Sequence, residues 1–156
     1  MRRLQRAIRM GFRLRVALML LAPLVLRAQG NGVLGDWQDP GGSIIQIDHC
    51  GADLCLWIVS LSRTAPATTD IHNPEPALRG RALCGLKIGS GFSLHDPDHA
   101  AGGSLYDPKS GKTYHGTMTA AGEKLDLRGY VGISLFGRTE TWTRPAAAVR
   151  GCKRSE

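Results

Sequence analysis

Apolar and polar residues alternate over short runs through most of the chain, and turn-forming residues separate the runs. This period of two is typical of β-strands, and no long stretch repeats its apolar residues at helical spacing. The pattern predicts strands at 32–38, 43–50, 55–61, 81–88, 103–106, 113–119 and 124–131, and it reads 128–144 as two strands broken by glycines. Many short strands with abundant glycine indicate an all-β fold, and we expect a single antiparallel barrel.

The clearest predicted hairpin joins 113–119 to 124–131. If Thr119 lies opposite Lys124, the two faces separate, with the aliphatic residues of both strands on one face and mostly polar residues, together with Tyr130, on the other. One face therefore packs on the core and the other faces solvent, so we expect the register of the hairpin to be well specified. The expected core face holds Tyr114, Gly116, Met118, Leu125, Leu127, Gly129 and Val131.

Two stretches do not fit the strand pattern. Residues 93–101 read as a polar loop, and 62–80 read as a long connection that contains a short helical turn. In that connection Asn73 is suited to capping the turn and Pro74 to its first position. Long connections often carry function, so the sequence directs the search for a site to this loop.

Residues 1–28 have the pattern of an export signal. The first fifteen residues carry six arginines and no acid, and an apolar run, Val16–Leu26, follows. A membrane span needs roughly 20 apolar residues, so the run is short for an anchor, although an uncleaved anchor is the alternative. We therefore expect an exported, periplasmic or secreted protein without a stable membrane span after cleavage, whose single barrel domain is 29–156.

The charge of the chain depends on this segment. The formal net charge is +7, but residues 1–28 hold seven of the twenty Lys and Arg and none of the thirteen Asp and Glu. The remainder carries thirteen of each sign and no basic cluster interleaved with aromatics. A nucleic-acid partner, which the total charge would suggest, is therefore not expected.

Four cysteines, an even number, predict disulfides in an exported protein. Cys50 and Cys55 flank a four-residue loop between two predicted strands, which sets them on one face, and Cys84 and Cys152 are then the remaining pair. The alternative, a zinc site, needs close ligand pairs, and Cys84 and Cys152 have none nearby. No metal is therefore assigned to the cysteines.

Candidate site residues concentrate in the long connection. Asp70, Asn73, Arg79 and Arg81 lie close together, and paired arginines present forked donors for a carboxylate or phosphate. The competing interpretation is structural, with Asp70 paired to an arginine and the segment plugging the barrel. Arg138 shares strand parity with Trp142, so it is either an internal ion paired with Glu140 or an anchor for a ligand.

Other chemistry finds little support. His95-Asp96-Pro97-Asp98-His99 offers metal-ligating side chains, but a solvated turn is the favoured interpretation. There is no nucleophile elbow and no glycine-rich phosphate loop opening a helix. The sequence thus predicts neither an enzyme nor a cofactor, and it identifies no partner protein.

Six motifs occur in order along the chain: Gly35–Trp37, Cys50–Cys55, Asp70–Arg81, Leu83–Leu86, Tyr106–Tyr114 and Arg128–Arg144. With these motifs the chain resembles the bacterial domain-of-unknown-function 2147 family. The resemblance implies an exported protein with a small barrel, and the activity of the family is unknown.

The chain is also similar to lipocalins, in which a Gly-x-Trp on the first strand packs under an arginine from the last strand. That similarity implies that Gly35, Trp37, Trp142 and Arg144 close one end of the barrel, in part by a cation–π contact. Two hypotheses follow. In the first, the barrel binds a small amphipathic or acidic molecule. In the second, side chains fill the barrel, and the protein is a structural or stress-related interaction protein of the cell envelope.

Overall fold

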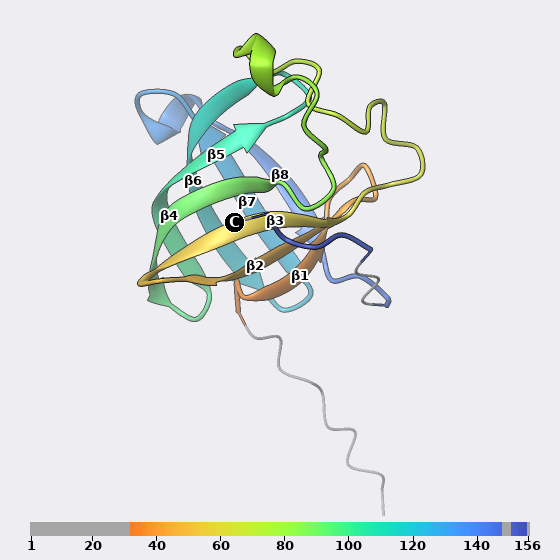
Figure 1. The fold of residues 1–156 in the computed structure, drawn as a ribbon. Coiled ribbons are helices and arrows are strands. Elements are labelled where there is room, and N and C mark those ends of the chain that lie inside the picture. The colour runs from red at the N-terminus through yellow and green to blue at the C-terminus, as the bar shows by residue number, and fades with distance from the viewer. Residues whose placement is uncertain (1–31, 148–150, 156) are drawn as a thin grey trace, which may run out of the picture.

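The computed structural model describes residues 32–147 and 151–155, so the predicted export signal lies outside the described residues. Eight strands form a closed antiparallel barrel in which each strand pairs with the next one along the chain (Figure 1). The predicted all-β barrel is confirmed. The strands are β1 Gly35–Gln38, β2 Ile44–Cys50, β3 Asp53–Ser60, β4 Lys87–Asp96, β5 His99–Asp107, β6 Lys112–Ala121, β7 Lys124–Tyr130 and β8 Arg138–Thr143, with two short 3-10 turns, η1 Pro76–Leu78 and η2 Ser134–Phe136.

The connections gather at two ends of the barrel because consecutive strands are antiparallel. The loop end holds the connections 39–43, 61–86, 108–111 and 131–137. The closed end holds the tight turns 51–52, 97–98 and 122–123, together with residues 32–34 and Arg144. Backbone hydrogen bonds tie the closed end together, from Val33 to Pro97 (2.8 Å) and from Arg144 to Glu123 (3.0 Å). No helix in the described part of the chain is long and apolar enough to cross a bilayer.

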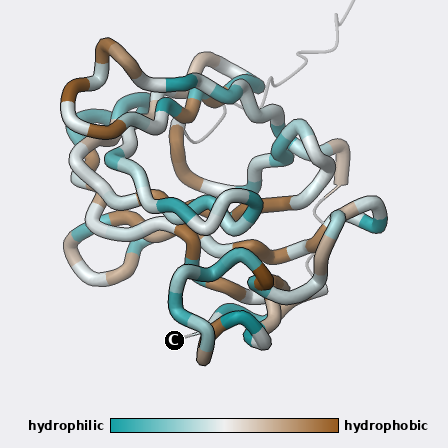
Figure 2. The backbone as a smooth tube through the Cα atoms, turned by 90° about the horizontal axis from the view of Figure 1, so that it is seen from above, coloured by the Kyte–Doolittle hydropathy of each residue, from teal (hydrophilic) through white to brown (hydrophobic). Residues whose placement is uncertain are grey.

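Apolar side chains fill the interior, which the strands surround when seen from above (Figure 2). Phe92 on β4 is fully buried, and Gly103 and Gly116 face its ring from β5 and β6. A Cβ atom at either glycine would overlap the ring, so the ring fits only because these strands lack side chains there. Leu83 and Leu86, from the long 61–86 connection, join the same cluster.

The seam between the first and last strands is short. Only one residue pair, Gln38 with Thr143, is recorded between β1 and β8, whereas six pairs join β7 to β8. The remainder of β8 therefore has one strand neighbour within the described part of the chain. Side-chain contacts from Arg144, described below, reinforce this seam.

The predicted hairpin has the expected faces but a shifted register. Thr119 lies opposite Asp126, and Lys124 lies opposite Ala121. This shift of two residues keeps every side chain on its predicted face, because the strand period is two. Val131 is the exception: β7 ends at Tyr130, and the Val131 side chain is 72% exposed.

Two other predicted elements are wrong. Residues 93–101 are mostly strand, since β4 continues to Asp96 and β5 begins at His99. Most side chains from Ser93 to His99 are exposed, so the alternation that reveals a strand is missing there. Residues 81–86 precede β4 and form no strand, except for one isolated bridge between Thr69 and Ala82.

The helical turn in the long connection is present but begins later than predicted. It is the 3-10 turn η1, with Pro76 at its start and Glu75 as its N-cap. Asn73 instead accepts a hydrogen bond from the Glu75 backbone N–H (2.9 Å), which orders the residues before the turn.

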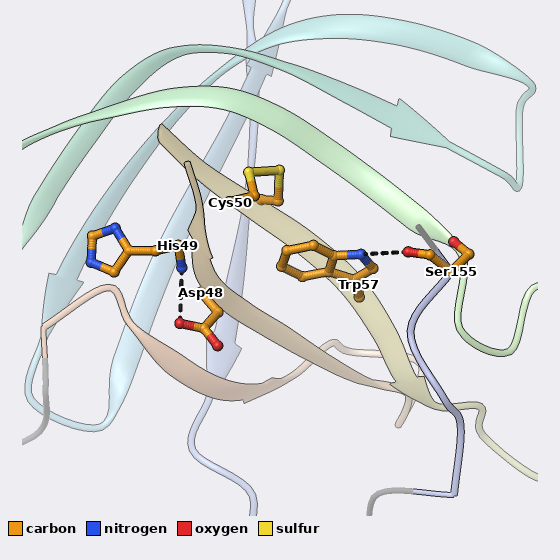
Figure 3. The surroundings of a disulfide bond; sticks show 6 residues. Asp48, His49, Cys50, Trp57 and Ser155 are labelled. Atoms are coloured by element: carbon orange, nitrogen blue, oxygen red, sulfur yellow. Dashed lines mark hydrogen bonds between the residues drawn. A yellow bond between two sulfur atoms is a disulfide. The ribbon is translucent and has the colours of Figure 1, made fainter. Parts of the chain in front are cut away.

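The outer face of β2 and β3 carries a second apolar cluster of Ile44, Cys55, Trp57 and Val59. Residues 151–155, here called the C-terminal strap, cover it. The Arg154 guanidinium stacks 4.5 Å from the Trp57 ring centre, and the Trp57 indole N–H donates to the Ser155 carbonyl (3.3 Å, Figure 3). The strap thus shields a large aromatic side chain that lies outside the barrel.

Candidate functional site

At the closed end, Arg144 covers Trp37. The guanidinium carbon lies 3.5 Å from the Trp37 ring centre, so the predicted cation–π contact is present. The same guanidinium donates to the backbone carbonyls of Gly32 (2.7 Å), Leu34 (2.9 Å) and Asp36 (3.2 Å). Gly35 has a φ of 104°, which favours glycine, and a Cβ there would lie only 2.9 Å from Arg144 Nη1. Both the backbone conformation and the close approach of Arg144 therefore require glycine.

Trp142 belongs to the same end of the core. It is buried opposite Leu125, and its indole N–H donates to Glu140 Oε2 (3.2 Å). Trp37 is fully buried and donates to the Val33 carbonyl (2.9 Å). Burial lowers the pKa of Arg144, but an arginine stays charged under all ordinary conditions. The indole N–H groups of Trp37 and Trp142 and the guanidinium of Arg144 therefore form their hydrogen bonds within the fold.

In the long connection, Asp70 is the centre of a closed hydrogen-bond network. Its side chain has no exposed surface, and it accepts from Tyr106 Oη (2.6 Å) and Asn73 Nδ2 (2.7 Å). Arg81 Nε donates to the Asp70 carboxylate (2.8 Å), and Arg81 Nη2 forms an ion pair with the same oxygen at 2.8 Å. This arrangement joins the 61–86 connection to β5, and it matches the structural interpretation of the motif.

The two arginines of the motif differ in their contacts. Arg81 is bound to Asp70 and also lies 5.4 Å from the Tyr106 ring centre. Arg79 is exposed and donates from Nε to the Asn73 carbonyl (2.9 Å). Asp70 and Asn73 are buried, so of the four predicted residues Arg79 has the most freedom to meet a ligand.

The Asp70 network makes stability depend on pH. Burial is the largest single influence and alone would raise the pKa of Asp70, but hydrogen bonds from Tyr106, Asn73 and Arg81 together outweigh it and lower that pKa. Tyr106 is the counterpart, because burial and the Asp70 charge raise its pKa, so it remains a neutral donor. The folded state thus holds the Asp70 proton more weakly than the unfolded chain does.

An acid whose pKa is lower in the folded state stabilises the fold at pH values above its unfolded-state pKa. This stabilisation is lost as the pH falls through its folded-state pKa. We expect the stability advantage of the natural protein over Asp70→Asn to be constant near neutral pH and to shrink below about pH 4. Urea unfolding of both proteins across this range measures it. The other acidic residues contribute equally to the two proteins, so their effects cancel when the two free energies of unfolding are subtracted. A stability advantage that persisted or grew at low pH would therefore contradict the lowered pKa of Asp70.

Arg138 lies at the loop end of β8. It is opposite Gly129, and the next residues of the same parity, Glu140 and Trp142, are opposite the buried Leu127 and Leu125. Paired residues share a face, so Arg138 and Glu140 occupy inner-face positions. Both are nevertheless exposed, and no hydrogen bond or ion pair of the Arg138 side chain is found within the described residues. Arg138 is thus not a buried internal ion.

The histidine-rich segment spans the end of β4, the turn 97–98 and the start of β5. His99 Nδ1 lies 2.9 Å from Asp96 Oδ1, and both side chains are about half exposed. Within residues 32–147 and 151–155, no three His, Cys, Asp or Glu side chains converge on a point where a metal could bind. The segment is thus a solvent-exposed hairpin end, in which Pro97 and Asp98 form the turn.

Both predicted disulfides are present, Cys50–Cys55 and Cys84–Cys152. The loop between Cys50 and Cys55 is shorter than predicted, because Cys50 lies opposite Asp53 and Cys55 opposite Asp48. The two cysteines are therefore diagonal neighbours on one face, with Cα atoms 5.7 Å apart. Cys84–Cys152 connects the C-terminal strap to the end of the long connection.

Sequence reasoning missed two features. The first is the C-terminal strap, whose contacts with Gln46 and Asp48 on β2 span more than a hundred residues and leave no local pattern. The second is the β7–β8 loop, 131–137, where four large apolar side chains are exposed; their spacing resembles that of a buried strand.

The described surface includes two open hollows. A groove of about 430 Å³ lies outside the barrel between Gln38, Ile44, Arg63 and the stretch 145–147. A smaller hollow of about 140 Å³ lies beside Lys87, Ser104 and Tyr106. Neither hollow is an enclosed chamber inside the barrel.

Comparison with known structures supports the fold. The barrel is similar to protein HP1028 from the human pathogen Helicobacter pylori, which is described as belonging to the lipocalin family. The two chains are 23% identical, and the match covers 72% of this chain and 82% of the other, with a TM-score of 0.65. At this identity the likeness concerns the fold alone. No match is found among curated proteins.

A family model gives the closer relationship. The family described as uncharacterized proteins conserved in bacteria, domain of unknown function 2147, matches residues 35–144, which is most of the chain. The matched region runs from the glycine of the closed end to the arginine that covers Trp37. The chain therefore belongs to this family of uncharacterized bacterial proteins.

Proposed function

We propose that this protein is an exported lipocalin-like binding protein that holds a small amphipathic molecule with an anionic group at the loop end of its barrel. The observation that carries the proposal is Arg138, an inner-face guanidinium that solvent reaches and that no described residue pairs with. A guanidinium presents several donors in one plane and suits a carboxylate or phosphate.

The surroundings of Arg138 support an apolar tail on the ligand. Below it on the inner face lie Leu127 and Met118, both buried, and Tyr114 stands half-buried beside Gly129. A ligand whose head reached Arg138 would therefore place its tail against apolar surface. Arg79, exposed on the 61–86 connection, is retained in the proposal as a second cation of the rim.

Binding at the mouth fits the packing better than binding in a deep chamber. Phe92, Leu83 and Leu86 occupy the interior, so the proposal places the ligand at the loop end, around Arg138. The two disulfides support an oxidising compartment, in agreement with the expected export to the periplasm or beyond. The proposal assigns no catalysis.

A second candidate function rests on that same filled interior. Because the Asp70 network fixes the 61–86 connection and its leucines pack into the core, the barrel can serve as a rigid scaffold without a ligand. The protein would then act through its surface, as an interaction protein of the cell envelope. The two candidates differ in whether the barrel mouth binds a small molecule.

Titration with a fluorescent fatty acid tests the first candidate. We expect Arg138→Gln to weaken binding about ten-fold, because a charge-assisted hydrogen bond is lost. Arg63→Gln, which changes an exposed arginine lining the outer groove, is the matched control and should bind as the natural protein does. Both variants should melt within a few degrees of the natural protein, since neither arginine is buried.

A fatty alcohol of the same length separates charge recognition from apolar contact. Its affinity should be the same for the natural protein and for Arg138→Gln. If the fatty acid bound both arginine variants equally well, the mouth would not be the site. If native mass spectrometry of the exported protein found no retained molecule and no probe bound, the scaffold function would be the better account.

A further inference from the structure

Exposed apolar side chains concentrate at the loop end. Within the described chain, seven large apolar residues are exposed, and six of them lie in the connections of this end, the exception being Leu94 on β4. Four are in the β7–β8 loop and are between 60% and 79% exposed. Grouped exposed apolar residues usually mark a contact surface, whereas scattered ones do not. The six are Ile71, Leu78, Val131, Ile133, Leu135 and Phe136.

The β7–β8 loop is held in a shape that keeps these side chains outward. Arg128 on β7 donates to the Ser134 carbonyl from Nε (2.9 Å) and Nη2 (2.6 Å), and to the Leu135 carbonyl (3.2 Å). Its remaining nitrogen, Nη1, donates to Thr139 Oγ1 at the start of β8 (3.0 Å). One side chain thus anchors the loop backbone from beneath and leaves the apolar side chains without a partner in the barrel.

The charges of the molecule are arranged along the same axis. The loop end, including the strand residues beside its turns, carries seven cations and four acids, and two of the acids, Asp70 and Asp39, lie beside Arg81 and Lys109. The closed end carries four acids, Asp53, Asp96, Asp98 and Glu123, and two cations, Lys124 and Arg144. The Arg144 guanidinium stacks on the Trp37 ring. The loop-end cations are Arg63, Arg79, Arg81, Lys87, Lys109, Lys112 and Arg138, and the acids there are Asp39, Asp70, Glu75 and Asp107.

We propose that the loop end docks on the surface of a lipid bilayer that contains anionic lipids, with the β7–β8 loop inserted among the headgroups. Apolar side chains on a projecting loop can enter the boundary between headgroups and acyl chains, and surrounding cations are attracted to anionic lipids. The acidic closed end then faces away from the membrane. This inference is independent of the small-molecule function proposed above.

The charge of the loop end favours a membrane over a second copy of the chain as its partner. Two loop ends facing each other would bring two sets of cations together, which opposes pairing. A bilayer surface offers the opposite charge and adapts to the shape of the loop. A membrane is therefore the occupant that both the apolar side chains and the charges fit.

Vesicle co-sedimentation tests the proposal, with protein purified after export and its N-terminal residue determined by mass spectrometry. We expect binding to vesicles of phosphatidylglycerol and phosphatidylcholine, weaker binding to phosphatidylcholine alone, and weaker binding as salt increases. The double variant Leu135→Ser with Phe136→Ser should lose about ten-fold or more in partitioning. Leu94→Ser, which changes an exposed apolar residue away from the loop end, should partition as the natural protein does.

Three results would overturn the inference. They are no binding to the anionic vesicles, binding that the double variant leaves unchanged, and equal losses in the double variant and in Leu94→Ser. Sedimentation velocity without lipid adds a fourth: a dimer that the double variant abolishes would show that the loop contacts a second copy. Thermal melts of both variants verify that the fold is intact, as the exposure of these side chains predicts.

Discussion

Replacing Trp37 with alanine is expected to lower the free energy of unfolding by about 3–5 kcal/mol, because truncating a large buried aromatic leaves a cavity in a packed core. Trp37 has no exposed surface, and its ring supports the Arg144 guanidinium, which in turn binds three backbone carbonyls near the N-terminal edge of β1. Urea denaturation measures the loss. If the alanine variant does not fold, Trp37→Leu retains most of the volume and should cost less.

A double-mutant cycle with Arg144→Ala isolates the contact between the two side chains. We expect a coupling of about 0.5–2 kcal/mol, the range for cation–π pairs. Trp57→Ala is the matched control, because Trp57 is a buried tryptophan under Arg154 on the outer face of the barrel and should show no coupling to Arg144. Additive losses from Trp37 and Arg144 would mean that the stacking contributes nothing to stability.

Replacing Asp70 with alanine is expected to cost about 3–5 kcal/mol, the range for breaking a buried pair by removing one partner. The change removes the shorter of the two hydrogen bonds that the buried Asn73 amide donates, the other being to Tyr106 Oη (3.2 Å), and it removes the counter-charge of Arg81. Arg81→Ala should cost less, since Asp70 keeps the hydrogen bonds from Tyr106 and Asn73.

Arg79→Ala is the control for the Asp70 network. Arg79 belongs to the same segment but is exposed and contacts one backbone carbonyl, so its loss should cost less than about 1 kcal/mol. Thermal or urea unfolding of the three variants gives the comparison. If Asp70→Ala and Arg79→Ala were equally stable, the network would not be what fixes the 61–86 connection.

Local patterns in the sequence were enough to predict the barrel and its disulfides. Alternation identified the faces of β6 and β7, and the cysteine pairs followed from their positions around one hairpin. The register was off by two residues because such a shift changes neither the pattern nor the buried face. Where strands extend beyond the core, as at His95 and Asp96, both faces are polar and no pattern remains to be read.

The candidate site was harder to predict because its residues meet through long-range contacts. The sequence proposed that an arginine pairs with Asp70, but it gave no sign of Tyr106, which donates to Asp70 from β5 thirty-six residues away. It also left the position of Arg138 open between a buried ion and a ligand anchor. That choice depends on where β8 leaves the packed part of the barrel, which strand parity alone does not determine.

The short seam between β1 and β8 bears on how the barrel forms. Every other strand pair joins neighbours along the chain, so most of the sheet can grow hairpin by hairpin with little loss of chain entropy at each step. The Gln38–Thr143 pair instead joins segments about a hundred residues apart, and beside the Arg144 side-chain contacts it is the one strand pair recorded between β1 and β8 in the described chain. We therefore expect closure to be the last event of folding and the seam to be the first place where the native barrel opens.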